Sequence, residues 1–312
     1  MDFYQEVLKR VMQNPSMRAW PQAQEILTAA AKAHLMLWQF PLMACRAVSG
    51  AEELAMSAAA AVACAHASIH LIDDVLDDDP RGEQQRYGAG YVANLASALQ
   101  AVGVEALEGC PTSAESCLAA CASLNRALAA TALGQAWDSQ NPSDEAAYWQ
   151  TTEMKGSPLF ATAFEMGALL GGAAAETASA LAHLGALYGV LIQISDDLSD
   201  SLETPANTDW LQNRWPLPIL FARVVDHPDR ERFLALRSPS MNLAELEEAQ
   251  EILVRCGAVS YCVDQLVTRH AEAQRFLAHI PLARRDEIEQ LLAEMIHPTL
   301  ELLHLSLQGS VN

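Results

Sequence analysis

Basic residues are scarce in this chain. It has 19 Lys and Arg residues against 39 Asp and Glu residues, which gives a net charge of −20 over 312 residues. A surface with this excess of negative charge repels the phosphate backbone of nucleic acids, so nucleic-acid binding is not expected. A small anionic ligand is still possible, but it would need bound metal ions or a few well-placed Lys and Arg side chains around it.

Glycine and proline are also few, at 15 and 14 residues, whereas 51% of the residues are hydrophobic. Such a composition favours helix over sheet and is sufficient for a large buried core. Apolar residues recur with a helical period along most of the chain, with no convincing strand and no linker. We therefore predict an all-α fold, a single large helical bundle over residues 1–312 with a central cavity.

No paired cysteine motif is present. The seven cysteines include no CxxC pair, and no His or further Cys completes a zinc set around Cys117 and Cys121. Most of them lie in apolar helical segments, which is typical of reduced core thiols. The N-terminus, MDFYQEVLKR, lacks the hydrophobic core of a signal peptide. Together these features favour a cytoplasmic location.

The most apolar stretch runs from Leu54 to Ile72. It is rich in alanine, contains His66 and His70, and continues into a cluster of aspartates without a basic flank. A helix that spans a bilayer does not usually end in this way. We therefore expect a buried helix and no stable membrane span, with the two histidines satisfied within it.

Helical periodicity and turn signals define the expected elements. We predict helices over residues 4–12, 21–37, 41–48, 52–77, 90–107, 113–139, 145–154, 158–170, 176–200, 217–225, 243–256, 258–278 and 284–307, with a polar loop over 203–213.

An aspartate cluster ends the apolar stretch. Asp73 and Asp77 share one face of the expected helix, and Asp74 flanks them. Like charges at this spacing repel one another, and the C-terminal end of a helix disfavours anions. Both effects destabilise the helix end unless positive charge is bound there, so we expect this cluster to bind cations. Carboxylate oxygens are suitable ligands for Mg²⁺.

The same spacing occurs a second time. Asp196, Asp197 and Asp200 end another long apolar helix, and Gln193 precedes them. Two such motifs facing one another can hold several Mg²⁺ ions around a diphosphate and stabilise it as an allylic C–O bond breaks. The apolar helices behind the acids would hold a hydrocarbon tail and exclude water.

At this point the sequence resembles the trans-isoprenyl diphosphate synthases of the class I isoprenoid synthase superfamily. The likeness extends from about Pro41 to Leu220 and includes the His66-Ala67-Ser68 and Gly134-Gln135-Ala136-Trp137-Asp138 segments. It implies an Mg²⁺-dependent enzyme that ionises an allylic isoprenyl diphosphate, with three metal ions when diphosphate is bound. The six aspartates would be the catalytic and metal-binding residues. A homodimer is also implied.

The resemblance assigns further binding residues. Lys155, in Lys155-Gly156-Ser157-Pro158, matches the lysine that contacts the allylic diphosphate, and Arg214 replaces a diphosphate-binding lysine. Arg81 and Gln193 are further candidates for the diphosphate. Small residues upstream of the first motif, Ala65, Ser68 and Ile69, are expected to line the tail pocket and to favour a substrate of farnesyl length or longer, unless Leu95 and Leu99 close that pocket from the opposite side.

One departure from the family is prominent. Elongating members carry a Gly-Lys-Arg-x-Arg-Pro segment that binds isopentenyl diphosphate, whereas this chain has Met36-Leu37-Trp38-Gln39-Phe40-Pro41. Losing two or three charge-assisted contacts would cost several kcal/mol at about 1.5–3 kcal/mol each. Lys32, Arg46 or other residues could supply the missing cations if the segments are aligned differently.

We therefore favour a non-canonical prenyltransferase or a terpene synthase, which uses the allylic cation without ordinary elongation. The first alternative is a polyprenyl diphosphate synthase that condenses isopentenyl diphosphate with an allylic diphosphate. The second is a non-catalytic regulatory subunit, although such a subunit would be free to lose its aspartates.

Overall fold

The computed structural model describes residues 2–108, 110–206, 208–236 and 241–309, with side chains up to His297 and without that of Thr208. Every regular element in these residues is a helix, as predicted. The α-helices are α1 (Phe3–Val11), α2 (Pro15–Arg18), α3 (Pro21–Lys32), α4 (Phe40–Ala47), α5 (Glu52–Leu76), α6 (Gln84–Tyr87), α7 (Ala89–Glu105), α8 (Ala114–Asp138), α9 (Glu145–Lys155), α10 (Ser157–Leu170), α11 (Ala175–Leu202), α12 (Thr208–Leu211), α13 (Leu217–Val224), α14 (Arg230–Leu236), α15 (Leu243–Arg255), α16 (Ala258–His279) and α17 (Asp286–Gly309). A 3₁₀ helix, η1 (Met36–Gln39), precedes α4.

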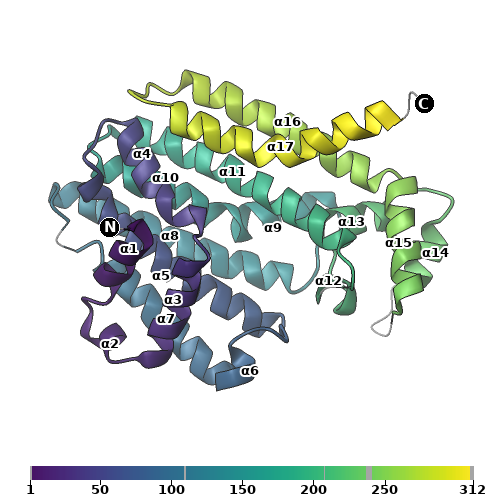
Figure 1. The fold of residues 1–312 in the computed structure, drawn as a ribbon, viewed down its shortest axis with the longest axis horizontal. Helices are drawn as coiled ribbons and strands as arrows, with labels where there is room; N and C mark the ends of the chain where they lie inside the picture. The colour runs from purple at the N-terminus through teal and green to yellow at the C-terminus, as the bar shows by residue number, and fades with distance from the viewer. Residues whose placement is uncertain (1, 109, 207, 237–240, 310–312) are drawn as a thin grey trace.

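Helices α5, α10 and α11 form the centre of the bundle. Helix α5 packs on α4, α7, α8 and α10, and α10 packs on α11. The alanine-rich stretch of α5 is buried on all sides. A helix that is apolar all round is expected in such a buried position. Figure 1 shows α16 and α17 lying along one side of the bundle, with α14 and α15 at the end opposite the N-terminal helices.

A smaller hydrophobic cluster lies at that far end. It includes Trp210, Phe233 and Leu253 from α12, α14 and α15. Trp215 packs against both this cluster and the main core, and α16 contributes residues to both. The two clusters are therefore continuous through shared residues. The division of the chain into one domain stays a prediction.

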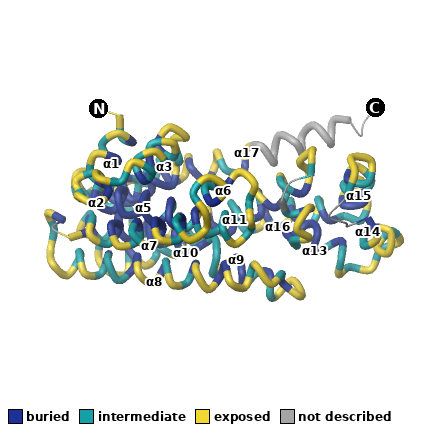
Figure 2. The backbone as a smooth tube through the Cα atoms, turned by 90° about the horizontal axis from the view of Figure 1, so that it is seen from below, coloured by how far each residue is buried: buried dark blue, intermediate teal, exposed yellow. Residues whose placement is uncertain are grey.

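Within the described residues, three helices, α5, α8 and α11, are long and apolar enough to cross a membrane by length and composition. In α5, 72% of the most apolar window is buried inside the protein, in agreement with the predicted buried helix. The corresponding share is 50% for α11 and 33% for α8. Figure 2 accordingly shows many exposed residues along α8, whereas much of α5 is buried.

The expected helix over residues 21–37 is shorter than predicted. Helix α3 ends at Lys32, and His34 has a positive φ of 51° that breaks the helix before η1 begins. Four short helices, α2, α6, α12 and α14, were not predicted, because elements of four to seven residues carry too little periodicity to be recognised. Helix α12 lies within the segment that we expected to be a loop.

Candidate active site

The ends of α5 and α11 border a cavity of about 590 Å³. Among the described residues, ten carboxyl side chains line it, against three cationic ones, Arg81, Lys155 and Arg214. The carboxyl groups are those of Asp73, Asp74, Asp77, Asp79, Asp138, Asp196, Asp197, Asp200, Glu203 and Asp209. The two predicted motifs therefore face the same cavity, together with residues from α8, α9 and α12.

The first motif occupies the last turn of α5. The helix ends at Leu76, and the backbone N–H of Asp77 donates to the carbonyl oxygen of Asp73 over 2.9 Å. Burial, with neighbouring Asp79, Asp73 and Asp77, raises the pKa of Asp74 to about 6. The pKa of Asp77 is raised as well, first by burial and then by Asp73. This crowding of carboxylates is the cost that a bound cation would relieve.

The second motif lies on the last turns of α11. Burial, followed by the charges of Asp200 and Asp197, raises the pKa of Asp196 to about 6. Asp196 accepts no hydrogen bond within the described part of the chain, so its oxygens face the cavity without a protein donor. Asp196 is therefore well suited as a metal ligand.

Asp197 has a different environment from Asp196. It is 5% exposed and accepts hydrogen bonds from the Tyr148 hydroxyl at 2.7 Å, the Leu217 backbone N–H at 2.8 Å and the Gln193 side-chain amide at 2.7 Å. Burial raises its pKa to about 6 despite these donors. Both oxygens thus join α9, α11 and α13, and this arrangement also occupies Gln193, which we expected on the diphosphate.

Two of the predicted cationic residues hold carboxylates of the motifs. The ammonium group of Lys155 lies 3.1 Å from Asp73 Oδ1 and 2.7 Å from Asp138 Oδ2. Burial alone would lower the pKa of Lys155, but the charges of Asp138 and Asp73 outweigh it and raise this pKa. Arg214 pairs with Asp77 and also donates to the Asp138 carbonyl oxygen at 3.1 Å.

A glycine permits the position of Lys155. A Cβ atom on Gly134 of α8 would lie 2.3 Å from the backbone nitrogen of Lys155 in α9, so a side chain there would force the two helices apart. The Gly134-Gln135 segment that contributed to the resemblance therefore has a packing role. Gln135 donates to the Ile69 carbonyl oxygen over 3.2 Å and so connects α8 to α5.

Arg81 lies at the rim of the cavity. Its side chain is 80% exposed and pairs with Asp79 at 3.1 Å. This contact lowers the pKa of Asp79, mainly through the hydrogen bond from the guanidinium. Arg81 is thus near the motif but more solvent-exposed than Lys155 and Arg214.

The three predicted tail-pocket residues, Ala65, Ser68 and Ile69, do not line this cavity. Ala65 and Ser68 are buried, and the Ser68 hydroxyl accepts a hydrogen bond from Gln100 of α7 at 3.0 Å. Leu95 and Leu99, on the opposite side, are fully buried. In this conformation α5 and α7 pack directly together where the tail was expected.

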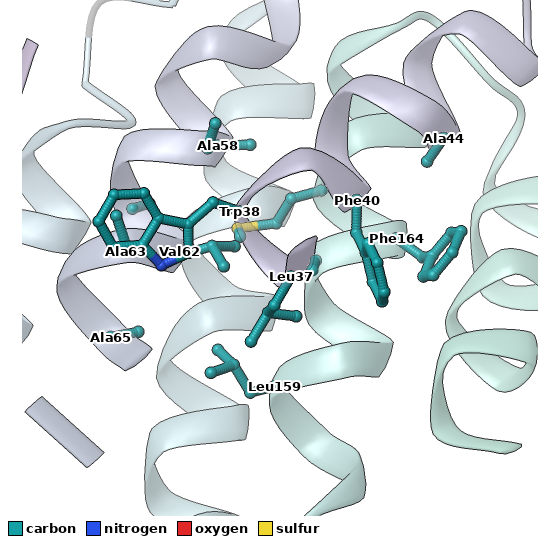
Figure 3. Packing of buried hydrophobic residues seen from close by; sticks show 14 of the residues in the cluster. Leu37, Trp38, Phe40, Ala44, Ala58, Val62, Ala63, Ala65, Leu159 and Phe164 are labelled. Carbon is teal, nitrogen blue, oxygen red and sulfur yellow. The ribbon is translucent and has the colours of Figure 1, made fainter. Parts of the chain in front are cut away.

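The segment that replaces the family's isopentenyl-binding residues is part of the core. Trp38 is 0% exposed and Phe40 is 1% exposed, and the Phe40 ring lies 5.0 Å from that of Phe164. Figure 3 shows Leu37, Trp38 and Phe40 among the buried hydrophobic residues.

The basic residues that could have compensated lie elsewhere. Lys32 is exposed, and Arg46 pairs with Glu287 over 3.0 Å and with Glu52 over 3.4 Å. Neither lines the cavity.

The donor set fits Mg²⁺ in its chemistry. Several hard carboxylate oxygens border one cavity, and burial followed by the charges of neighbouring carboxylates raises the pKa values of Asp74 and Asp196. However, no three His, Cys, Asp or Glu side chains of the described residues converge on one point that could hold an ion. Lys155 and Arg214 form ion pairs with Asp73 and Asp77 of the first motif. These ion pairs would have to break before the two carboxylates could bind a set of three ions.

The sequence interpretation gave no role to Asp138, Tyr148 or Asp209. Asp138 belongs to the matched Gly-Gln segment, so its position was a usable signal. Asp209 lies in the segment expected to be a loop, and burial, followed by the charges of Asp197 and Asp200, raises its pKa to about 7. Neither Asp209 nor Tyr148 could be found from spacing, because tertiary folding brings them to the second motif.

Known proteins with similar sequences match the part of the chain that contains both aspartate motifs. The sequence profile of the polyprenyl synthetase family matches residues 30–253. A short chain isoprenyl diphosphate synthase of Methanothermobacter thermautotrophicus is 27% identical over 265 residues, which cover 78% of this chain and 76% of that protein. A geranylfarnesyl diphosphate synthase of Aeropyrum pernix is 25% identical over 277 residues, covering 82% and 86% respectively.

Solved structures share the fold. A polyprenyl synthase from Caulobacter crescentus, complexed with calcium and isoprenyl diphosphate, superposes with a TM-score of 0.78 at 23% identity and covers 94% of this chain and 93% of that one. A geranylgeranyl pyrophosphate synthase reaches a TM-score of 0.82 at 18% identity, covering 95% of both chains. Because the profile extends over both aspartate motifs and most of the bundle, the chain belongs to the polyprenyl synthetase family, whose members are prenyltransferases of the isoprenyl diphosphate synthase type.

Proposed function

We propose that the protein binds an allylic isoprenyl diphosphate with Mg²⁺, ionises it, and transfers the prenyl group to isopentenyl diphosphate. The observation that supports this most is the meeting of both aspartate motifs, Lys155 and Arg214 at one cavity. Two of the matched relatives are a short chain isoprenyl diphosphate synthase and a geranylfarnesyl diphosphate synthase. These relatives favour elongation over the non-elongating reaction that the sequence alone suggested to us.

The residues of the cavity have distinct tasks in this proposal. Asp73, Asp74, Asp77, Asp196 and Asp200 would hold Mg²⁺, which would neutralise the pyrophosphate group as the C–O bond breaks. Lys155 and Arg214 would donate to pyrophosphate oxygens. Both now pair with carboxylates of the cavity, so they are already positioned within reach of a ligand there.

Asp197 has a positioning task. Its hydrogen bonds to Tyr148, Gln193 and the backbone of Leu217 fix the end of α11 relative to α9 and α13. The orientation of neighbouring Asp196 depends on this anchor. In this proposal Asp197 supports the metal site rather than ligating the ion.

A second candidate is a transferase or cyclase that does not use isopentenyl diphosphate. It is favoured by the complete burial of Trp38 and Phe40 in the segment where elongating members carry cations. Of the cationic side chains described, those that line the cavity are Arg81, Lys155 and Arg214, and our assignment already places two of them on the allylic diphosphate. Little positive charge is left for a second diphosphate.

Product analysis separates these candidates. The protein is incubated with Mg²⁺ and C10, C15 or C20 allylic diphosphates, with and without labelled isopentenyl diphosphate. Longer diphosphates indicate elongation, whereas pyrophosphate release without chain growth indicates the second candidate. Absence of pyrophosphate release from every substrate would contradict both and would favour a non-catalytic subunit.

The remaining expectations belong to the same proposal. A homodimer would cover the exposed apolar residues of α8, among them Leu118 at 72% and Leu133 at 43% exposure. The cytoplasmic location, the absence of a membrane span and the preference for a farnesyl or longer substrate are also proposed. Sedimentation of the purified protein without detergent tests the homodimer, because it measures the mass of the particle in solution.

A further inference from the structure

A histidine pair lies on α5 just inward of the first aspartate motif. The Nε2 atoms of His66 and His70 are 2.9 Å apart, and the ring centroids are 4.3 Å apart. His70 lines the cavity, whereas His66 does not. Since α-helices rise 1.5 Å per residue, His70 lies about 5 Å inward of Asp73 and Asp74 on nearly the same face. The mechanism described so far leaves this pair unused.

The surroundings of His66 indicate which tautomer is present. His66 Nδ1 is enclosed by protein and has no hydrogen-bond partner among the described residues. A buried N–H without a partner is rare and costs about 1–3 kcal/mol, so the proton of His66 belongs on Nε2. His66 Nε2–H then donates to His70 Nε2. Consequently His70 carries its own proton on Nδ1.

The pKa values of both rings are lowered, which favours their uncharged forms. Burial, followed by the charge of His70, lowers the pKa of His66 to about 3. His70 is exposed where it lines the cavity, but desolvation by the surrounding protein still lowers its pKa, with Asp73 opposing this and Lys155 adding to it. The Nδ1–H of His70 makes no hydrogen bond with the residues that the structure describes. It is therefore a neutral donor available in the cavity.

We propose that His70 is a further diphosphate-binding residue, whose Nδ1–H donates to the pyrophosphate oxygen that is bonded to the allylic carbon. This inference rests on the proposed function of the cavity. If the metal ions lie at Asp73 and Asp74, the next helical turn inward lies beside the junction of pyrophosphate and hydrocarbon. His70 is the polar side chain of α5 at that level that lines the cavity.

A neutral donor at this place assists cleavage. When the C–O bond breaks, the electron pair stays on the oxygen, and the hydrogen bond from Nδ1–H strengthens as negative charge develops there. No proton is transferred. An uncharged ring also leaves the nearby carboxylates to the metal ions, because it adds no positive charge that would compete for them.

Binding of inorganic pyrophosphate with saturating Mg²⁺, measured by calorimetry on the full chain, tests this role. His70→Leu removes the donor, whereas His70→Gln keeps an N–H of similar reach. We expect the Kd to rise about 10-fold in the Leu variant and less than about 3-fold in the Gln variant, as for one hydrogen bond. With an allylic diphosphate, kcat of the Leu variant should fall about 10–100-fold, with KM changing less.

The outcomes are distinguishable. If both variants behave alike, or if His70→Leu leaves Kd and kcat within twofold of the parent, His70 is not a donor to pyrophosphate. If the parent protein releases no pyrophosphate from any allylic substrate, the proposed function fails, while the calorimetric comparison still decides the role of His70. Thermal melts establish whether each variant is folded. If the Leu and Gln variants do not fold, His70→Met and His70→Asn take their places in the comparison.

Discussion

Lys155 gives the sharpest test of how the acidic cavity is stabilised without metal. Its ammonium group contacts Asp73 and Asp138 at 3.1 and 2.7 Å, and its side chain is 21% exposed. Lys155→Met keeps most of the side-chain volume but leaves two carboxylates without this partner. Partly buried pairs of this kind contribute about 1–3 kcal/mol together, less than a fully buried pair because solvent screens them. The melting temperature without Mg²⁺ should fall by about 2–6 °C.

Added Mg²⁺ should reverse part of that loss. In the parent protein the metal competes with Lys155 for Asp73, whereas in Lys155→Met that carboxylate is available. Differential scanning fluorimetry should therefore show a larger Mg²⁺-induced stabilisation in the variant than in the parent. Affinity for pyrophosphate should nevertheless fall about 10–100-fold, since one charge-assisted hydrogen bond is lost.

Lys32→Met is the matched control, because Lys32 is exposed and does not line the cavity. It should change neither the melting temperature nor the effect of Mg²⁺. The reasoning is refuted if Lys155→Met melts like the parent without Mg²⁺, or if Mg²⁺ stabilises both proteins equally. Either result would mean that Lys155 does not neutralise the carboxylates of the cavity when Mg²⁺ is left out.

Three further predictions follow from the same geometry. Asp196→Asn should reduce Mg²⁺-dependent pyrophosphate release at least about 100-fold without lowering the melting temperature, because it removes a carboxylate that lacks a protein partner. The raised pKa values of Asp74 and Asp196, about 6 against 3.8, mean that the folded state binds more protons than the unfolded state between these values. These two groups should therefore make the metal-free protein less stable as pH rises from 4 to 6, and denaturant titrations should show Mg²⁺ reducing that slope. Trp38→Ala should cost about 3–5 kcal/mol of unfolding free energy through a core cavity, whereas Met36→Ala, at 42% exposure, should cost less than 1.

The fold and the two motifs could be predicted because helical periodicity determines them locally. Asp73 and Asp77 share a face through their spacing alone. The apolar residues around the whole circumference of α5 predict that the helix is buried on all sides. The closeness of Asp196 to the first motif, in contrast, was available only through the family resemblance. Without it, the sequence shows two acidic helix ends but not that they face one cavity.

The partners of these residues could not be predicted in the same way. Asp197 has the same sequence context as Asp196, yet one residue of helical rotation turns it toward Tyr148 and the Leu217 backbone. Ser68 has the small side chain expected of a tail pocket, but its hydroxyl accepts a hydrogen bond from Gln100, 32 positions away in the sequence. Both outcomes depend on which distant helix packs alongside, and helix spacing carries no information about that.

The balance of charge in the cavity has a consequence for the order of binding. Ten carboxyl side chains face three cationic ones, and Lys155 and Arg214 already pair with Asp73 and Asp77. A diphosphate that arrived alone would meet a site of its own sign and would have to take these cations from the carboxylates, exposing yet more negative charge. A divalent cation meets the opposite situation, because it neutralises the acids and frees Lys155 and Arg214 for the pyrophosphate oxygens. Metal should therefore bind before the diphosphate or together with it, and calorimetric titration of pyrophosphate without Mg²⁺ should show no binding at concentrations that saturate the metal-loaded protein.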